Sequence, residues 1–392
     1  MDDYTDYTSL NQRVTTTCSG IFTFQLGLNH AQLQITLQRI VDAQNRFQSS
    51  PLATVANNLE KEVVVSSVFG TNTIEGGELS ENETEHALAL SPKDVQTTQQ
   101  KRVINIKNAY DFVRQIASQP HWQPTLNDVL RIHQQVYNGL PTDHEHSAPG
   151  VLRDNPKGTL TQVGNSEHGG VYKPPQLGKD IKLLLEGLLN WNQQLAQAGL
   201  PALIRAPLVH LYFELIHPFW DGNGRVGRVL EAGILYADGF RYAPFAQANF
   251  YLKHIHHYFA LFNACRKAAD KKHEFANHEF VAFFLDGLLE TINHLHDRVN
   301  RLIHIVLFEA KLKNLQDDKV IRPRQYAIVN AVLHNGAGLS LAQLKKQPWY
   351  NALYAKLTEK TQSRDLAKLK NLNLIVVDAQ GLLLPGFIEN FK

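Results

Sequence analysis

Apolar side chains recur at intervals of three and four residues along most of this chain, the spacing of helices that bury one face. The pattern covers residues 33–68, 94–117, 180–197, 206–217, 225–238, 249–269 and 279–315. Strand signals are short, and the clearest falls in a Gly- and Pro-rich loop, where 151–171 predicts a hairpin that turns at 155–158. The chain is therefore predicted to be all-α, with a few short strands.

Composition excludes several classes of protein. The 392 residues are 43% hydrophobic and 19% charged, which is ordinary for a globular chain and argues against disorder or a collagen-like repeat. The net charge of +2 gives no general argument for nucleic-acid binding. Cys18 and Cys265 are too few for a disulfide framework. With an acidic N-terminus and no long apolar run, we expect a cytoplasmic protein without a membrane span.

The C-terminal segment changes character after a polar stretch at 317–319. Three short helical patterns and two apolar runs around a glycine follow, at 322–333, 340–346, 361–372, 374–377 and 382–384. Helices followed by a β-ribbon are typical of a winged helix-turn-helix. Lysines and an arginine give its third helix a basic tint, so both DNA binding and protein docking stay open for this module.

One stretch carries most of the chemistry, HPFWDGNGRVGR at residues 217–228. A histidine ends one helix, and a glycine-rich loop opens the next, where free backbone N–H groups favour an anion. Arg225 and Arg228 lie three residues apart and project from one side of that helix toward phosphate oxygens. Asp221 suits Mg²⁺, which prefers a carboxylate together with phosphates, and His217 suits a general base.

Other interpretations of this stretch are weaker. Its G-x-G-x-x-G spacing matches a dinucleotide-binding fingerprint, but that motif needs a preceding strand, and a helix is predicted here. The P-loop string is absent. A plain helical corner with a surface histidine does not account for so many polar residues in so short a segment.

The stretch 217–228 resembles the signature of the Fic family, HPFx[D/E]GNGRxxR, with each defining position filled. The resemblance implies a helical Fic core that transfers AMP from ATP to a hydroxyl side chain. It implies that His217 is the catalytic base and that Asp221 holds Mg²⁺. Contacts to ATP are implied for the loop and the first turn of the helix, at Gly222, Asn223, Gly224, Arg225, Val226, Gly227 and Arg228. Tyr251 and Tyr258 are candidates for the nucleotide pocket, with core packing as the alternative.

A second segment, Thr71 to Gly76, fits the family's inhibitory motif [S/T]xxxE[G/N]. In the family this glutamate, here Glu75, pairs with the second motif arginine, here Arg228, and misaligns ATP. Thr71 and Gly76 are the motif's other defining positions. An Arg–carboxylate pair competes with an Arg–phosphate contact, so the proposed inhibition is physically plausible.

The loop at 150–175 resembles the family's flap, a hairpin that docks the target protein by main-chain pairing. The domains implied are an N-terminal helical region at 1–115 with the inhibitory motif, a Fic core at 116–316 and a winged helix at 317–392. We expect a protein adenylyltransferase that uses ATP and Mg²⁺ and is inhibited by Glu75. Three alternatives stay open: removal of AMP by a Glu75-positioned water, transfer of another phosphate-containing group, and a DNA-binding regulator with a nucleotide-sensing core. Self-modification and a homodimer also stay open.

Overall fold

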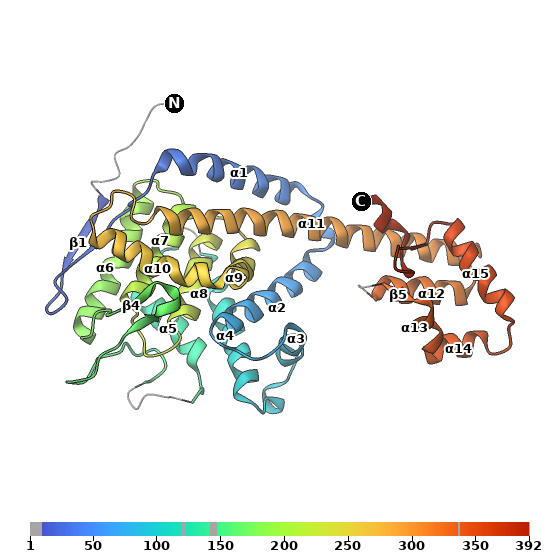
Figure 1. Ribbon diagram of the computed structural model, residues 1–392, viewed down its shortest axis with the longest axis horizontal. Helices are drawn as coiled ribbons and strands as arrows, with labels where there is room; N and C mark the ends of the chain where they lie inside the picture. The colour runs from blue at the N-terminus through green and yellow to red at the C-terminus, as the bar shows by residue number, and fades with distance from the viewer. Residues whose placement is uncertain (1–9, 120–121, 142–146, 336–337, 392) are drawn as a thin grey trace. The chain divides into compact units, whose positions relative to one another are not determined.

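The computed structural model describes residues 10–119, 122–141, 147–335 and 338–391, which divide into two compact units (Figure 1). The first comprises 1–49 and 56–296, and the second comprises 50–55 and 297–392. The stretch 1–9, on which part of the expected cytoplasmic location rests, lies outside the described residues. No helix within the described ranges combines the length and apolar character needed to cross a membrane.

The first unit is almost wholly helical, as the periodicity predicts. Its helices are α1 (His30–Ser49), α2 (Ala56–Ile74), α3 (Glu81–Leu88), α4 (Thr98–Ala117), α5 (Leu126–Tyr137), α6 (Gly178–Gln197), α7 (Ala202–Ile216), α8 (Asn223–Ala237), α9 (Ala243–Lys253) and α10 (Ile255–Asp270). Helix α11 (His278–Asp317) begins in this unit and continues into the second.

Helix α7 is the centre of the first unit, and α6, α8 and α10 pack against it. Its sequence, ALIRAPLVHLYFELI, is apolar on all sides, which is typical of a helix enclosed by others. Every residue of α7 is buried except Glu214. The polar residues at its C-terminal end are therefore held on a rigid support.

Two small antiparallel hairpins belong to the same unit. The pair β3 (Val163–Asn165) and β4 (Gly170–Tyr172) lies within the predicted range, but its turn spans 166–169 instead of the predicted 155–158. Residues 157–158 form a turn that lies outside any strand. Sequence reasoning missed the pair β1 (Gln12–Thr15) and β2 (Ile21–Phe24), which depends on tertiary packing. The Phe24 ring stacks on Trp191 of α6, with 5.8 Å between ring centroids.

The second unit contains the predicted helices and strands. They are α12 (Pro323–His334), β5 (Leu339–Ser340), α13 (Leu341–Lys346), α14 (Pro348–Tyr354), α15 (Glu359–Asn371), β6 (Ile375–Val377) and β7 (Leu382–Pro385). The strands form one antiparallel sheet in the order β5-β7-β6. Sequence reasoning missed α14 and β5. The winged-helix assignment and the boundaries at 115/116 and 316/317 stay predictions.

Truncating a core side chain of the second unit should destabilise that unit. Leu369 of α15 is fully buried, whereas Leu353 of α14 is 40% exposed. We expect Leu369→Ala to lower the free energy of unfolding by about 2–5 kcal/mol, because it leaves a cavity. Leu353→Ala should cost about 0.5 kcal/mol or less. Hydrogen exchange of the amides in 297–392 measures both effects, and equal costs would contradict the packing described.

Candidate active site

The loop between α7 and α8 places the candidate catalytic histidine at a sharp corner. His217 caps α7 in the left-handed conformation, with φ 50° and ψ 64°, which is unfavourable for a residue other than glycine. Gly222, with φ 82°, then leads into α8. The Asn223 side chain closes the loop, because its amide accepts from the Phe219 backbone N–H and donates to the Phe219 carbonyl, both at 2.8 Å.

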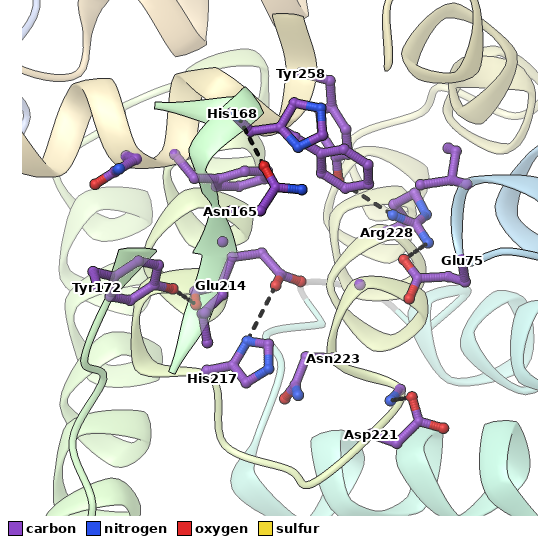
Figure 2. Close-up of a pocket in the computed structure, with 18 of the residues that line it drawn as sticks. Glu75, Asn165, His168, Tyr172, Glu214, His217, Asp221, Asn223, Arg228 and Tyr258 are labelled. Atoms are coloured by element: carbon purple, nitrogen blue, oxygen red, sulfur yellow. Dashed lines mark hydrogen bonds and ion pairs between the residues drawn. The ribbon is translucent and has the colours of Figure 1, made fainter. Parts of the chain in front are cut away.

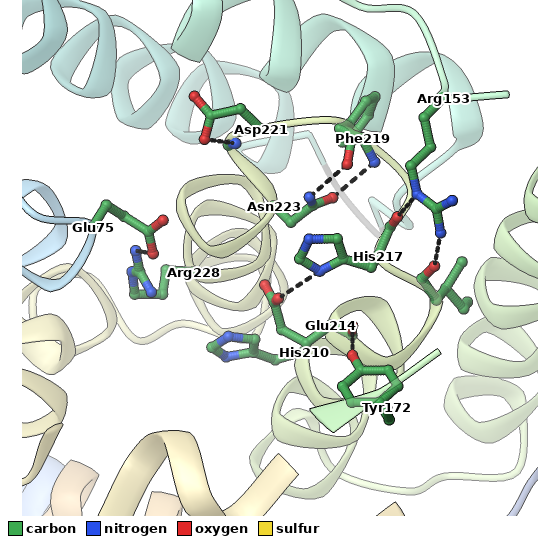
Figure 3. A network of polar contacts seen from close by, with 12 residues as sticks. Glu75, Arg153, Tyr172, His210, Glu214, His217, Phe219, Asp221, Asn223 and Arg228 are labelled. Atoms are coloured by element: carbon green, nitrogen blue, oxygen red, sulfur yellow. Dashed lines mark hydrogen bonds and ion pairs between the residues drawn. The ribbon is translucent and has the colours of Figure 1, made fainter. Parts of the chain in front are cut away.

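Arg153 supports the strained corner from the side (Figure 3). Its side chain is fully buried, and its Nε donates to the His217 carbonyl at 2.6 Å. A second nitrogen, Nη2, donates to the Ile216 carbonyl at 3.3 Å. Burial lowers the pKa of Arg153 to about 10, which leaves the side chain charged at neutral pH. Sequence reasoning noted Arg153 only as a flap border, since a lone arginine in a loop gives no signal of this role.

His133 of α5 supports the same loop from the opposite side. Its ring stacks on Phe219 with 3.7 Å between ring centroids. Nδ1 accepts from the Gly150 N–H at 2.8 Å, so Nε2 carries the proton and donates to the Asp221 carbonyl at 3.1 Å. Burial lowers the pKa of His133 to about 4, consistent with a neutral ring. This contact was also missed, because His133 lies far from the motif in sequence.

Glu75 and Arg228 form the ion pair that the resemblance implies. Nη2 of Arg228 donates to Oε1 of Glu75 at 2.6 Å, and Arg228 is buried. Burial alone would raise the pKa of Glu75, but the charges of Arg228 and Arg225 and the hydrogen bond from Arg228 outweigh it and hold that pKa below its ordinary value. A Cβ atom on Gly224 would overlap Oε1 of Glu75. The carboxylate therefore occupies the space beside the first turn of α8.

The other residues of the second motif hold Glu75 in place. The Thr71 hydroxyl shares a buried hydrogen bond of 2.8 Å with the Tyr110 hydroxyl. Gly76, with φ 77°, ends α2 in the left-handed conformation typical of a helix C-terminus. Arg102 of α4 donates to the Glu75 carbonyl at 2.6 Å, a contact that sequence reasoning missed. The end of α2 is thus tied to α4 as well as to α8.

Asp221 and Arg225 lie together at the N-terminus of α8. Oδ2 of Asp221 accepts from Nη2 of Arg225 at 2.7 Å, and Oδ1 accepts from the Gly222 N–H at 2.6 Å. Burial would raise the pKa of Asp221, but Arg225 and the hydrogen bonds lower it, so the carboxylate is charged. The Asp221 side chain is 52% exposed, and Nε and Nη1 of the buried Arg225 find no hydrogen-bond partner among the described residues.

The residues at this corner can hold Mg²⁺ only if a bound ligand supplies further oxygen atoms. Across the part of the chain that is described, no group of three or more His, Cys, Asp or Glu side chains is arranged to hold a metal. Asp221 offers one exposed carboxylate, and Mg²⁺ is commonly bound by one or two carboxylates plus substrate phosphates. The donor set therefore suits an ion that arrives with a nucleotide.

A cavity of about 410 Å³ brings the predicted residues together (Figure 2). Its lining includes His217, Asp221, Gly222, Asn223, Gly224, Arg228, Glu75 and Tyr258. The flap, from Val163 to Tyr172, forms one wall, and α10 forms another. The motif histidine, the buried Arg228 and the Glu75 carboxylate thus line one space.

Four residues predicted to contact ATP do not line this cavity. The Arg225 side chain is buried and donates to Asp221, and Val226 is fully buried. Gly227 faces α7, where an added Cβ would lie 3.0 Å from both His210 and Glu214. The Tyr251 hydroxyl donates to Glu231 within the core. Val226, Gly227 and Tyr251 thus pack beside the cavity, and their contacts to ATP stay predictions.

A buried chain of hydrogen bonds fixes the far side of Arg228. Nη1 of Arg228 donates to the Tyr258 hydroxyl at 3.2 Å, which lies 3.0 Å from Nε2 of His210. Nδ1 of His210 lies 2.6 Å from a carboxylate oxygen of Glu231. Both ring nitrogens of His210 thus have partners within the core. Glu231 was missed, because a carboxylate inside an apolar helix carries no motif.

The flap rests on α10 through polar contacts to its turn. Nε2 of His168 lies 3.1 Å from Nδ1 of His256. Asn263 donates to the Gly170 carbonyl at 3.0 Å, and Lys267 donates to the Gly169 carbonyl at 2.7 Å. At the base of the flap, the Tyr172 hydroxyl donates to the Glu214 carbonyl at 2.6 Å. These contacts hold the hairpin beside His217.

Comparisons with known proteins find similarity to the same family as the motif at 217–228. A sequence model of the Fic/DOC family matches residues 123–235. Protein adenylyltransferases of Caenorhabditis briggsae and Nematostella vectensis are each 26% identical to the chain over 210 and 213 residues, which is 52% and 53% of this chain but 38% and 46% of theirs. The chain thus matches less than half the length of these relatives. A solved Fic family protein of Desulfovibrio desulfuricans G20 shares the fold, with a TM-score of 0.55, 19% identity and coverage of 87% of this chain and 89% of that one.

The ion pair of Glu75 predicts a pH dependence of stability. Because folding depresses the pKa of Glu75, the stabilisation by the pair is fully present at neutral pH and is lost as the pH falls through the folded-state pKa. We expect Glu75→Gln to cost about 3 kcal/mol at pH 7, since Arg228 is left buried without its partner. The difference from wild type should shrink below about pH 4.

Unfolding of both proteins between pH 7 and pH 3 measures that difference. Glu78→Gln is the matched control, because Glu78 is exposed and lies three residues further along the chain. A cost for Glu75→Gln that does not change with pH would contradict the charge-based origin of the pair.

Proposed function

Since residues 123–235 match the sequence model of the Fic/DOC family, we propose that this protein transfers AMP from ATP to a Tyr, Ser or Thr hydroxyl of a target protein. The observation that carries the proposal is the shared cavity. His217, Arg228 and the N-terminus of α8 face one space, and Glu75 fills part of it. The relatives named protein adenylyltransferases support the same reaction.

The phosphates of ATP would lie at the N-terminus of α8. The free N–H groups there and the Arg228 guanidinium favour negative charge. Asp221 would hold Mg²⁺ together with the phosphates, and the ion would neutralise charge on the leaving pyrophosphate. Gly222 and Gly224 carry no side chain, which allows the phosphates to approach the backbone closely.

His217 is the proposed general base. As the target hydroxyl attacks the α-phosphorus, its oxygen forms the new O–P bond and the bond to pyrophosphate breaks. The hydroxyl proton passes to the His217 imidazole, which later releases it to solvent. The left-handed corner directs the ring into the cavity, next to the flap where the target segment would lie.

Glu75 is the proposed inhibitor of this reaction. Its carboxylate holds Arg228 by a charge-assisted hydrogen bond and occupies the space beside Gly224. A phosphate group would compete with Glu75 for both. Release of Glu75 would free Arg228, whose second contact to Tyr258 keeps the guanidinium in place.

Removal of AMP is a second candidate activity, favoured by one observation. Glu75 and His217 line the same cavity, so the Glu75 carboxylate can hold a water where a target hydroxyl would otherwise attack. This activity would need Glu75, whereas transfer would be restrained by it. The two activities therefore respond to the same substitution in opposite directions.

The target would dock along the flap at 150–175 by main-chain pairing. Self-modification, a homodimer and a DNA contact by the second unit stay predictions. Tyr172 of the flap is a poor self-modification site, because it is buried and its hydroxyl donates to the Glu214 carbonyl. An acceptor hydroxyl must instead reach His217 from an exposed segment.

Releasing the inhibitor should raise AMP transfer. We expect Glu75→Gly to increase labelling of protein by α-labelled ATP and Mg²⁺ at least about tenfold, since one charge-assisted contact is worth about 1.5–3 kcal/mol. Adding His217→Ala to Glu75→Gly should abolish the label. Label that persists without His217 would contradict its role as base, and a Glu75→Gly protein that binds ATP but labels nothing would exclude AMP transfer.

Removal of AMP should fall when Glu75 is replaced by glycine. Protein labelled by the Glu75→Gly variant, then freed of nucleotide, is the substrate for this measurement. If Glu75 positions water, added wild-type protein should release AMP, while added Glu75→Gly should release at least about tenfold less. Equal release by the two proteins would exclude a part for Glu75 in removal.

A further inference from the structure

We propose that Glu214 is a positioning residue for His217. Its carboxylate holds the imidazole with the proton on Nδ1, so that the lone pair of Nε2 is presented to the attacking hydroxyl. The step that Glu214 would assist is proton transfer to His217, so the inference rests on the proposed function. The orientation of the ring is a property of the protein alone and can be measured separately.

The first support is the position of the two side chains (Figure 2). Glu214 lies on the last turn of α7, and His217 is the residue that caps this helix. Oε2 of Glu214 lies 3.7 Å from Nδ1 of His217, just beyond hydrogen-bonding distance. Catalytic hydrogen bonds are often long in unliganded proteins and shorten when substrate binds.

The second support is that each residue carries a buried polar atom without a partner. Nδ1 of His217 and Oε1 of Glu214 have no hydrogen-bond partner in the described part of the chain. A buried polar atom without a partner costs about 1–3 kcal/mol, so each such atom calls for an explanation. A small rotation of the Glu214 carboxylate would let it accept the Nδ1 proton, which satisfies the imidazole.

The third support is that the neighbouring polar groups are already engaged. His210, one turn before Glu214, lies against Tyr258 and Glu231. The Tyr172 hydroxyl donates to the Glu214 carbonyl and not to its carboxylate. Arg153 donates to the His217 carbonyl and so fixes the backbone and not the ring. Glu214 is therefore the carboxylate left to face the ring.

The motif glycine at 227 makes room for this carboxylate. A Cβ atom at Gly227 would lie 3.0 Å from Oε1 of Glu214, closer than nearly all side-chain contacts. The glycine thus lets α8 pack against the side chain that faces His217. This explains why Gly227 belongs to the site although it does not line the cavity.

The chemical role follows from the charge that develops in the reaction. When Nε2 takes the proton of the target hydroxyl, the ring becomes a cation, while the new O–P bond forms and pyrophosphate leaves. The Glu214 carboxylate stabilises that cation, and its hold on Nδ1 keeps the basic nitrogen toward the cavity. In catalytic triads, a histidine base and an orienting carboxylate have the same two roles.

The experiment compares Glu214→Gln and Glu214→Met with their parents. Gln keeps an acceptor and loses the charge, while Met loses both at similar volume. Nitrogen-15 NMR of histidine-labelled protein reports which ring nitrogen carries the proton, with the His217 signals assigned by their loss in His217→Ala. Initial rates of AMP transfer in the Glu75→Gly background give kcat and the KM for ATP. Glu186→Gln on neighbouring α6 is the control, because that carboxylate is 45% exposed.

We expect the neutral wild-type ring to carry its proton on Nδ1 and the Met variant to lose this preference. We expect kcat to fall by about 10- to 100-fold in Glu214→Met and less in Glu214→Gln, with the KM for ATP within about twofold. Retention of the Nδ1 proton in Glu214→Met would overturn the inference, whatever the rate does, and so would an unchanged kcat. If Glu75→Gly transfers no AMP, the proposed function fails, and the NMR comparison alone decides the role of Glu214.

Discussion

The site depends on a backbone corner that the chain would not adopt unaided. His217 sits in a left-handed conformation that costs free energy, and neighbours on both sides hold it there. Arg153 binds its carbonyl, while Asn223 closes the loop onto Phe219. Because these contacts come from buried side chains, the corner keeps its shape without a ligand. The free N–H groups of α8 and the imidazole therefore face the cavity before any substrate arrives.

Around that corner, buried charges occur in pairs and chains. Arg228 lies between the Glu75 carboxylate and a path of hydrogen bonds that ends at Glu231. A buried guanidinium needs such partners, since desolvation of a lone charge costs several kcal/mol. The arginine is thus stable in a water-poor site while one of its contacts can be exchanged. This asymmetry would make the proposed release of Glu75 compatible with a rigid core.

Sequence reasoning found the residues that carry a motif and missed those that support them. His217, Asp221, Arg228 and Glu75 could be placed because each stands at a fixed interval within a short string. Arg153 and His133 act from loops and helices far away in sequence, so no spacing reveals them. Glu214 was within reach, because it stands three residues before the motif histidine, on the last turn of the helix that His217 caps.

The same contrast appears in the fold. The 3.6-residue period located the long helices, because a helix that buries one face repeats its apolar residues at that period. The β1–β2 pair was missed because four-residue strands carry too little pattern and owe their stability to contacts such as Phe24 on Trp191. The position of the flap turn was wrong for a related reason. Asn155–Gly158 has turn chemistry, but the strands pair around Gly169.

The docking of the flap has a consequence for how such a protein can change over evolutionary time. Asn263 and Lys267 hold the hairpin by the carbonyls of Gly170 and Gly169, which are backbone atoms that every sequence possesses. The Val171 side chain, which is 49% exposed, can then be exchanged without loosening the hairpin from α10. If the flap docks a target as proposed, recognition of new partners can diverge there while the loop at His217 stays unchanged.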